Sequence, residues 1–195
     1  MNDIRPEDIT AVVLAGGQGS RMGGRDKGLV SFRGKSLVSH AVDAIRQQLD
    51  RVIINANRNL DDYAALGLPV ISDELTGFQG PLAGFLAALD AVETSYILTL
   101  PCDGPVVHPD YAARMRQAIN SKGADIVVAS DGAWMQPVYA LVPRALRDDL
   151  AAFLASGERK IDRWYARHDT YQQVFPADSG FFTNINTLQE LETTP

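Results

Sequence analysis

The chain of 195 residues has one cysteine, no long apolar run and no excess of positive charge. A single Cys102 excludes an intrachain disulfide and a metal site built from several cysteines. No apolar run approaches the roughly 18 residues that a membrane-spanning helix needs. The polar start MNDIRPEDIT also has no signal-peptide core. We therefore expect a cytoplasmic protein with no membrane partner.

The charge balance excludes a second class of partner. The formal net charge is −6, which argues against a general nucleic-acid-binding role. The three histidines share no ligand spacing, so we interpret them as structural. The hydrophobic fraction of 46% is enough for a sizeable core in one domain over residues 1–195.

Short β-branched runs alternate with longer helical patterns along the chain. This alternation predicts an α/β fold, in which a mostly parallel, mixed sheet is covered by helices on both faces. The predicted strands are Ile9–Leu14, Arg51–Asn55, Pro69–Ser72, Tyr96–Leu100, Asp125–Ala129, Val138–Val142 and Tyr171–Phe175. The predicted helices are Ser36–Leu49, Pro81–Val92, Pro109–Asn120 and Pro143–Leu154.

Ligands of open α/β sheets bind beyond the carboxyl ends of the strands. That rule selects the segments after the first four predicted strands, and we expect them to line one crevice. They are the glycine-rich stretch after Leu14, the stretch Asn55–Arg58, Asp73, and Pro101–Asp103.

The glycine-rich stretch LAGGQGSRMGGRDKGL, residues 14–29, combines close backbone approach with cationic charge, as a phosphate-binding loop does. It is not a dinucleotide fingerprint, because Met22 occupies the place of the third glycine. It is not a P-loop either. Gly34-Lys35-Ser36 has the right ending, but Leu29 replaces the first glycine, so we interpret that tripeptide as a turn with a helix cap.

The stretch resembles the signature of nucleotidyltransferases that activate sugars and cofactors. In its full length it looks like that of the molybdenum cofactor guanylyltransferases. Further segments match that family in order, so the resemblance covers nearly the whole chain. They are Asn55–Arg58, Gly80–Gly84, Pro101–Asp103, Gln136–Pro137 and Asn184–Thr187. The chain departs from the family at Ser36 and Leu188, where proline is usual, and both lie at apparent helix starts.

The resemblance implies a Rossmann-like domain of the nucleotide-diphospho-sugar transferase type. Its N-terminal half would bind the nucleotide and its C-terminal half the acceptor. The implied activity is magnesium-dependent transfer of GMP from GTP to the phosphate of molybdopterin, with release of pyrophosphate. Proteins that deliver molybdopterin or receive the finished cofactor are implied partners.

The attacking phosphate oxygen is already ionised, so this chemistry needs positioning and charge neutralisation more than a general base. We predict that Lys27 stabilises the transferring phosphate and Arg21 the leaving phosphates. Asp103 is the predicted magnesium ligand and Cys102 its buried neighbour. The loop residues predicted to contact the nucleotide are Leu14, Ala15, Gly16, Gly17 and Gly19.

For the nucleoside, Asn55 and Asp73 match family positions associated with GTP binding. A carboxylate can accept from N1 and N2 of guanine, but either residue could bind ribose or shape a turn. Gly80 and Gly84 would leave space for the nucleoside, and close helix–sheet packing is the alternative for Gly84. Candidate pterin contacts are Trp134, Gln136, Arg159, Lys160, Asn184 and Asn186.

These acceptor contacts have their own alternatives. Trp134 could instead anchor a loop, and Arg159 and Lys160 could be a solvated face. Three other functions compete with guanylyl transfer. They are cytidylyl transfer to the same pterin, nucleotidyl transfer to a sugar or polyol phosphate, and GTP binding without catalysis. The residues Gly16-Gly17, where the cytidylyl family usually has Ala-Gly, favour GTP.

Overall fold

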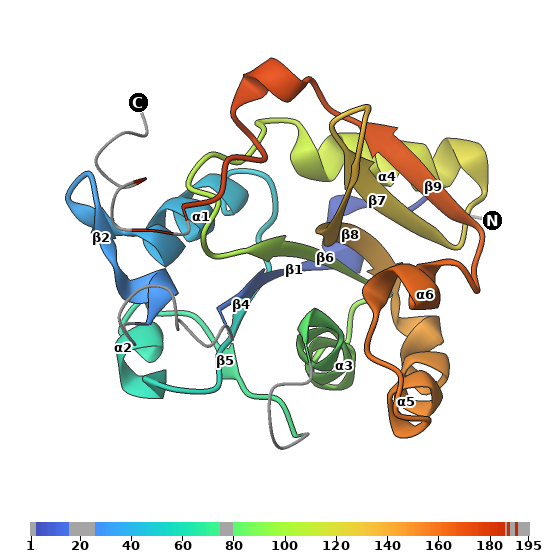
Figure 1. The fold of residues 1–195 in the computed structure, drawn as a ribbon, viewed down its shortest axis with the longest axis horizontal. Coiled ribbons are helices and arrows are strands. Elements are labelled where there is room, and N and C mark those ends of the chain that lie inside the picture. Colours follow the sequence, from blue (N-terminus) through green and yellow to red (C-terminus); the bar gives the residue numbers. More distant parts are fainter. Residues whose placement is uncertain (1–2, 16–25, 75–79, 186, 188–189, 191–195) are drawn as a thin grey trace.

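The computed structural model describes residues 3–15, 26–74, 80–185, 187 and 190. Its main feature is a sheet with the strand order β5-β4-β1-β6-β8-β7-β9 (Figure 1). Neighbouring strands are parallel except for β8, which is antiparallel to both β6 and β7. The strands are β1 (Ile9–Leu14), β4 (Val52–Asn55), β5 (Val70–Ile71), β6 (Tyr96–Pro101), β7 (Ile126–Ser130), β8 (Met135–Pro143) and β9 (Thr170–Val174).

The predicted mixed, mostly parallel sheet is confirmed, and β1 has its predicted bounds. The largest difference is in β8, which begins at Met135 instead of Val138. The reason is a tight turn after β7 that pairs Met135 directly with Ser130. The β7–β8 hairpin therefore reaches further than the apolar run alone indicated.

Helices cover both faces of the sheet, as predicted (Figure 1). Alternating side chains of β1 explain how one strand serves both faces. Ala11 and Val13 pack with α1 and α4, whereas Val12 packs with α3, α5 and α6. The helices are α1 (Leu37–Ile45), α2 (Leu60–Ala64), α3 (Pro81–Ala91), α4 (Tyr111–Lys122), α5 (Arg147–Ala155) and α6 (Ile161–Tyr165).

The Gly-Lys-Ser tripeptide is a turn and a cap, as predicted. Gly34 has φ +81° in the turn between β2 (Ser31–Phe32) and β3 (Lys35–Ser36). The Ser36 side chain then accepts from the backbone N–H of Ser39 at 3.3 Å and caps α1.

The sequence prediction missed β2, β3, α2 and α6. Each spans five residues or fewer, too short for a hydrophobic period to be visible. The predicted helix Pro143–Leu154 also starts later, because the 3-10 helix η4 (Arg144–Leu146) precedes α5. Within the described residues, the structure contains no helix long and apolar enough to cross a bilayer.

The C-terminal segment returns to the first half of the chain. Ile185 packs with Phe32 and Leu37 in a small buried cluster. Its backbone N–H donates to the carbonyl of Asp103 at 2.9 Å. Residues more than 80 positions apart in sequence therefore meet at the end of β6.

Candidate active site

The carboxyl ends of β1, β4 and β6 lie side by side at one edge of the sheet. The strand register places Leu14 beside both Asn55 and Pro101. Beyond the strands, the N–H of Ala15 donates to the Asn55 carbonyl at 2.8 Å, and that of Cys102 donates to the Leu14 carbonyl at 3.0 Å. The three predicted segments thus leave the sheet together, which is where α/β proteins bind ligands.

Lys27 and Asp103 form an ion pair at this edge. The Lys27 ammonium donates to Oδ2 of Asp103, and the two side chains are only 18% and 17% exposed. Lys27 belongs to the 3-10 helix η3 (Lys27–Leu29), and Asp103 follows β6. The two residues that sequence analysis assigned to the phosphate and the metal are therefore in direct contact.

The second oxygen of Asp103 fits a cation site. Oδ1 is buried and accepts no hydrogen bond from the described part of the chain. Leaving such an oxygen unsatisfied is unfavourable, and Mg²⁺ prefers oxygen ligands. The described residues hold no group of three or more His, Cys, Asp or Glu side chains suited to a metal. One carboxylate completed by substrate phosphates and waters is a usual magnesium arrangement.

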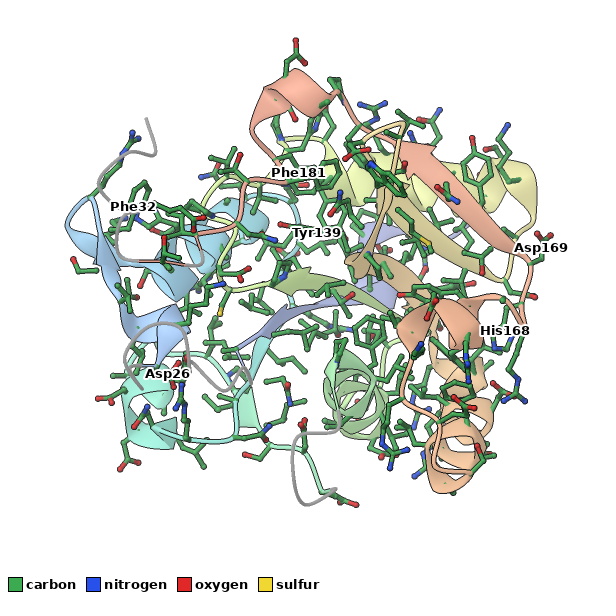
Figure 2. All side chains as sticks on the ribbon, viewed as in Figure 1. Asp26, Phe32, Tyr139, His168, Asp169 and Phe181 are labelled. Atoms are coloured by element: carbon green, nitrogen blue, oxygen red, sulfur yellow. The ribbon has the colours of Figure 1, made fainter. Side chains whose placement is uncertain are left out.

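Two buried side chains, Cys102 and Tyr139, lie close enough to Asp103 for its charge to affect them. Burial raises the pKa of the Cys102 thiol well above its ordinary value, and the Asp103 carboxylate adds to this effect. Cys102 is therefore a neutral buried neighbour, as predicted. Burial also raises the pKa of Tyr139, which packs near Phe181 (Figure 2). Gly104 admits this tyrosine, since a Cβ there would lie 2.5 Å from the Tyr139 hydroxyl.

Asn55, Asn57 and Asp73 form a second polar group, at the ends of β4 and β5. The side-chain amides of Asn55 and Asn57 donate to different oxygens of the Asp73 carboxylate, at 2.9 and 2.8 Å. The Asn57 side-chain oxygen accepts from the Asp73 backbone N–H at 2.8 Å. Both asparagines therefore orient the carboxylate, and each of its oxygens retains lone pairs.

Asn57 was not among the predicted site residues. Its only sequence signal was its place in the Asn55–Arg58 segment. Strand alternation could not reveal its partner, because Asp73 is 16 positions away and follows a different strand. The pairing exists because β4 and β5 are parallel neighbours.

Close packing accounts for the glycine at position 84. Gly84 lies in the buried face of α3, where a Cβ would be 2.5 Å from Oδ1 of Asn55 and 2.9 Å from Cδ2 of Leu14. Gly80 is different. It precedes α3 with φ +76° and ψ −176°, a conformation open almost only to glycine, and its Cβ position is open, the nearest atom being the Arg159 carbonyl at 4.0 Å.

We expect Gly84→Ala to disturb the polar group of Asn55, Asn57 and Asp73. The added methyl must push Asn55 away from Asp73 or move α3 from the sheet. Overpacking of this kind costs about 1–3 kcal/mol, and GTP binding should weaken as well. Chemical denaturation and GTP titration measure the two effects. In an Asn55→Ala background the methyl meets less resistance, so the stability loss should shrink. An equal loss in both backgrounds would assign the clash to Leu14 instead.

The predicted acceptor residue Trp134 lies at the tip of the β7–β8 hairpin and is 75% exposed. The Asp131 carboxylate organises this tip by accepting from the backbone N–H groups of Trp134 and Ala133, at 2.7 and 2.9 Å, and from Gln136 at 3.2 Å. These hydrogen bonds hold the pKa of Asp131 below its ordinary value. The indole is exposed and does not hold the loop by burial, whereas the backbone of Trp134 is bonded within the tip. Its ring is open to a ligand.

The other acceptor candidates that the structure describes lie apart from one another, Arg159 near Gly80 and Asn184 near Gly104. The Arg159 guanidinium donates to the carbonyls of Leu154 and Glu158, at 2.7 and 2.6 Å, and so helps to end α5. Lys160 is exposed at the start of α6. Asn184 is near the Asp103 turn, with its Oδ1 3.5 Å from the Cβ position of Gly104.

Part of the predicted site falls on residues whose structure is not described. Gly16, Gly17, Gly19, Arg21 and Asn186 lie outside the described ranges. Their roles stay predictions from the sequence.

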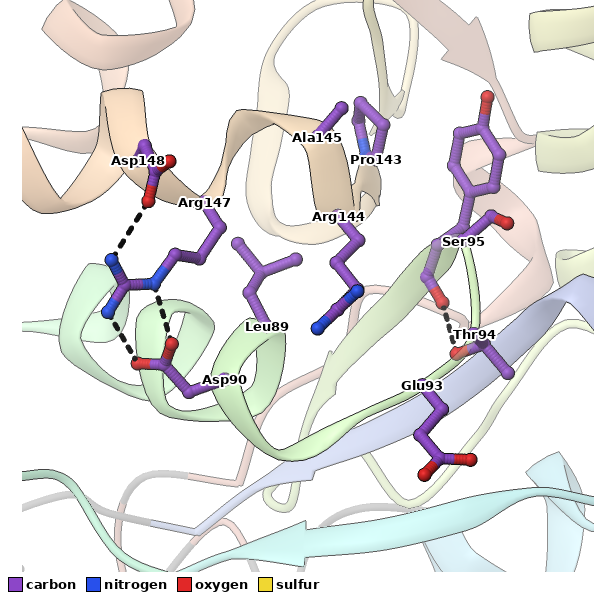
Figure 3. A pocket seen from close by; sticks show the side chains of 11 residues that line it. Leu89, Asp90, Glu93, Thr94, Ser95, Pro143, Arg144, Ala145, Arg147 and Asp148 are labelled. Carbon is purple, nitrogen blue, oxygen red and sulfur yellow. Dashed lines mark hydrogen bonds and ion pairs between the residues drawn. The ribbon is translucent and has the colours of Figure 1, made fainter.

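An open pocket of about 770 Å³ lies at the other end of the sheet, where β6 begins and α3 ends (Figure 3). Arg147 spans part of it, with Nε 2.6 Å from Oδ1 of Asp90 and Nη1 2.9 Å from Oδ1 of Asp148. None of the predicted site residues is among those that line it. Its position, at the amino ends of the strands, is also opposite to the usual ligand edge.

Known proteins are similar to this chain in sequence. Residues 11–172 match the MobA-like NTP transferase domain. A molybdenum cofactor guanylyltransferase of Shewanella putrefaciens is 50% identical over 185 residues, which cover 95% of each chain. The chain belongs to the MobA-like NTP transferase family. This family comprises nucleotidyltransferases, so the predicted enzyme class is confirmed.

Solved structures agree on the fold. Molybdopterin-guanine dinucleotide biosynthesis protein A of Archaeoglobus fulgidus superposes with a TM-score of 0.73 at 23% identity, over 94% of this chain and 95% of that one. A CMP:2-keto-3-deoxy-manno-octonic acid synthetase, solved with CTP, has a TM-score of 0.74 at 14% identity, over 95% of each chain. The likeness at these identities shows the nucleotide-diphospho-sugar transferase fold that the resemblance implied.

Proposed function

We propose that the protein transfers GMP from GTP to the phosphate of molybdopterin and releases pyrophosphate. The contact between Lys27 and Asp103 carries this proposal. It supports the proposal because an ammonium and a carboxylate meet at the edge where such sheets bind ligands, and these are the groups that a phosphate and a magnesium ion would need. The name and high identity of the Shewanella guanylyltransferase support the choice of GTP and pterin.

Lys27 is the residue we assign to the transferring phosphate. Its side chain is 18% exposed, and a charge in such a partly desolvated place acts more strongly than one in water. When GTP enters, the ammonium can exchange its Asp103 partner for a phosphate oxygen. Arg21 is the residue we assign to the leaving phosphates.

Asp103 is the residue we assign to magnesium, because its Oδ1 is buried and accepts no hydrogen bond from the residues that the structure describes. Bound magnesium would neutralise phosphate charge and polarise the α-phosphorus. The pterin phosphate is an ionised nucleophile and needs no strong base. The chain therefore contributes chiefly fixed charges and fixed geometry.

Asp73 is the residue we assign to guanine, with Asn55 and Asn57 as its supports. Two amide donors hold the carboxylate, which keeps it oriented as an acceptor. Guanine offers N1–H and N2–H₂ as neighbouring donors, which a carboxylate can accept together. Cytosine has no such pair of adjacent donors.

The exposed indole of Trp134 is a stacking surface for the pterin ring. Gln136, Asn184 and Asn186 can supply hydrogen bonds, and Arg159 and Lys160 positive charge. We place the reaction in the cytoplasm, where proteins that deliver molybdopterin and receive the product would be partners.

Pyrophosphate release tests the proposal. Purified protein with molybdopterin and Mg²⁺ should release pyrophosphate with GTP and much less with ATP, CTP or UTP. Equal release with CTP would favour the cytidylyl alternative. Release with a sugar phosphate in place of molybdopterin would favour nucleotidyl transfer to a sugar or polyol phosphate. Binding of GTP with no release under any acceptor would leave a non-catalytic module.

Asp73→Ala should weaken GTP binding by about 1–3 kcal/mol, the range for a lost hydrogen-bond partner of a buried polar group. Calorimetric titration with GTP and inosine triphosphate measures this. Glu74→Ala is the matched control, since Glu74 is the adjacent carboxylate and is exposed. If inosine triphosphate, which lacks N2, binds wild-type protein as well as GTP does, the N2 contact is wrong.

A further inference from the structure

Asp26, directly before Lys27, has a buried carboxylate that the reaction scheme does not use. Its side chain is 3% exposed. Oδ1 accepts from the Tyr63 hydroxyl at 2.7 Å and from the Gly28 backbone N–H at 3.3 Å. Oδ2 accepts from the Asn59 amide at 2.9 Å and lies 3.3 Å from Nε of Arg58. Figure 2 shows Asp26 beside α2.

A negative charge is unexpected here, since a loop that binds phosphates should attract anions. Burying a carboxylate is costly unless hydrogen bonds and an opposite charge compensate. Asp26 has both. Its charge is neutralised locally by Arg58, so it opposes an incoming phosphate less than an exposed carboxylate would. What remains is its geometric effect on the start of η3.

The sequence is adapted around this carboxylate at two places. Gly28 is required because a Cβ there would lie 2.5 Å from the Tyr63 hydroxyl that bonds Asp26. Asn59 adopts φ 51° and ψ 39°, a left-handed conformation that is unfavourable for most residues and tolerated by asparagine. Among the described residues, Arg33 is the other non-glycine residue with positive φ.

The stretch Asn55–Asn59 thereby connects both halves of the candidate site. At its start, Asn55 and Asn57 hold Asp73. At its end, Arg58 and Asn59 hold Asp26. A short stretch after β4 thus orients the Asp73 carboxylate and fixes the start of η3, which carries Lys27.

We propose that Asp26 is a positioning residue that holds Lys27 in place through η3. The left-handed Asn59 in turn holds Asp26 through its side-chain amide. This inference rests on the function proposed above, in which Lys27 acts on the transferring phosphate. A misplacement of about 1 Å in a catalytic group costs on the order of 10²-fold in rate. Asp26 acts through Lys27 and touches no substrate.

A double-mutant cycle between Asp26→Asn and Lys27→Ala tests this directly. In wild-type protein, Asp26→Asn should lower kcat on the order of 10²-fold while KM for GTP changes much less. In the Lys27→Ala background it should change kcat by about twofold or less, because the ammonium that Asp26 positions is already absent. Equal losses in both backgrounds would overturn the proposal, because Asp26 would then act by another route.

Asn59→Gly is the gentler variant. Glycine accepts the left-handed backbone and removes only the amide that bonds Asp26. It keeps the carboxylate and its other three partners, so it carries the test even where Asp26→Asn fails to fold. Arg33→Gly is the matched control, with the same backbone change at φ 49° in the β2–β3 turn. We expect Asn59→Gly to lower kcat and Arg33→Gly to leave kcat unchanged. Equal rates for these two proteins would overturn the role of Asn59.

Amide exchange gives a readout that needs no substrate. Measured by NMR, the hydrogen-exchange rate of the Gly28 N–H should rise in Asp26→Asn and in Asn59→Gly. It should be unchanged in Arg33→Gly. Unchanged exchange in all three would refute the positioning contact. Faster exchange in a protein whose wild type releases no pyrophosphate would instead refute the proposed function and leave the contact standing.

Discussion

Asp103→Asn is expected to abolish most nucleotidyl transfer while the protein still folds and binds GTP. Asparagine keeps the shape of the side chain, but its neutral oxygen is a poorer magnesium ligand than a carboxylate. The variant also removes the charge that pairs with Lys27. The residual activity should require much higher Mg²⁺. Pyrophosphate release measured against Mg²⁺ concentration for both proteins gives the answer.

Asp110→Asn is the matched control for this experiment. Asp110 also follows β6, but it is exposed before α4 and its side chain makes no cap hydrogen bond there. Its loss should leave both rate and magnesium dependence unchanged. A near-wild-type rate with unaltered magnesium dependence in Asp103→Asn would remove Asp103 from the metal site. Loss of cooperative melting in that variant would indicate instead that the Lys27–Asp103 pair is needed for folding.

Lys27→Ala is expected to lower turnover by about 10²-fold or more, the range for loss of one charge-stabilising contact in an active site. The affinity for GTP should fall less, because the predicted contacts at Asp73 and the glycine-rich stretch remain. Steady-state kinetics and calorimetric titration separate the two effects. Uniform loss of binding with an unchanged kcat would indicate that Lys27 holds the ground state only.

Lys35→Ala tests the specificity of that result. Lys35 belongs to the Gly-Lys-Ser tripeptide that resembles the end of a P-loop. Its ammonium pairs with Asp43 at 2.6 Å on the surface, with both side chains more than half exposed. Surface pairs of this kind contribute about 0–1 kcal/mol. Turnover should be unaffected, and a loss comparable to that of Lys27→Ala would reopen the assignment of the phosphate loop.

The sheet and its main helices were predictable because their sequence signals are local. Apolar β-branched runs predicted every strand of the seven-stranded sheet, and Ser36 predicted the start of α1. The elements that escaped prediction are the short ones, β2, β3, α2 and α6. Tertiary contacts rather than periodicity maintain them. Tyr63 of α2, for example, is fully buried and bonds Asp26.

The sequence predicted where the candidate site lies but not which of its side chains contact each other. Parallel strands end at one edge, so the segments after Leu14, Asn55 and Pro101 could be expected to meet. Their pairing partners could not be expected. Neither the contact of Lys27 with Asp103 nor that of Asn57 with Asp73 follows from spacing, since each joins segments that follow different strands.

The sequence by itself determined the kinds of chemistry present: a cationic glycine-rich stretch, a carboxylate after β6, and an α/β sheet to hold them. These follow from residue type and local pattern, which need no knowledge of the fold. Tertiary structure alone decided the partner of each side chain. It buried Asp26 among Tyr63, Asn59 and Arg58, and left the indole of Trp134 exposed. The physical reason is that hydrogen bonding and burial depend on distances between atoms, and strand order sets these distances for residues far apart in the chain.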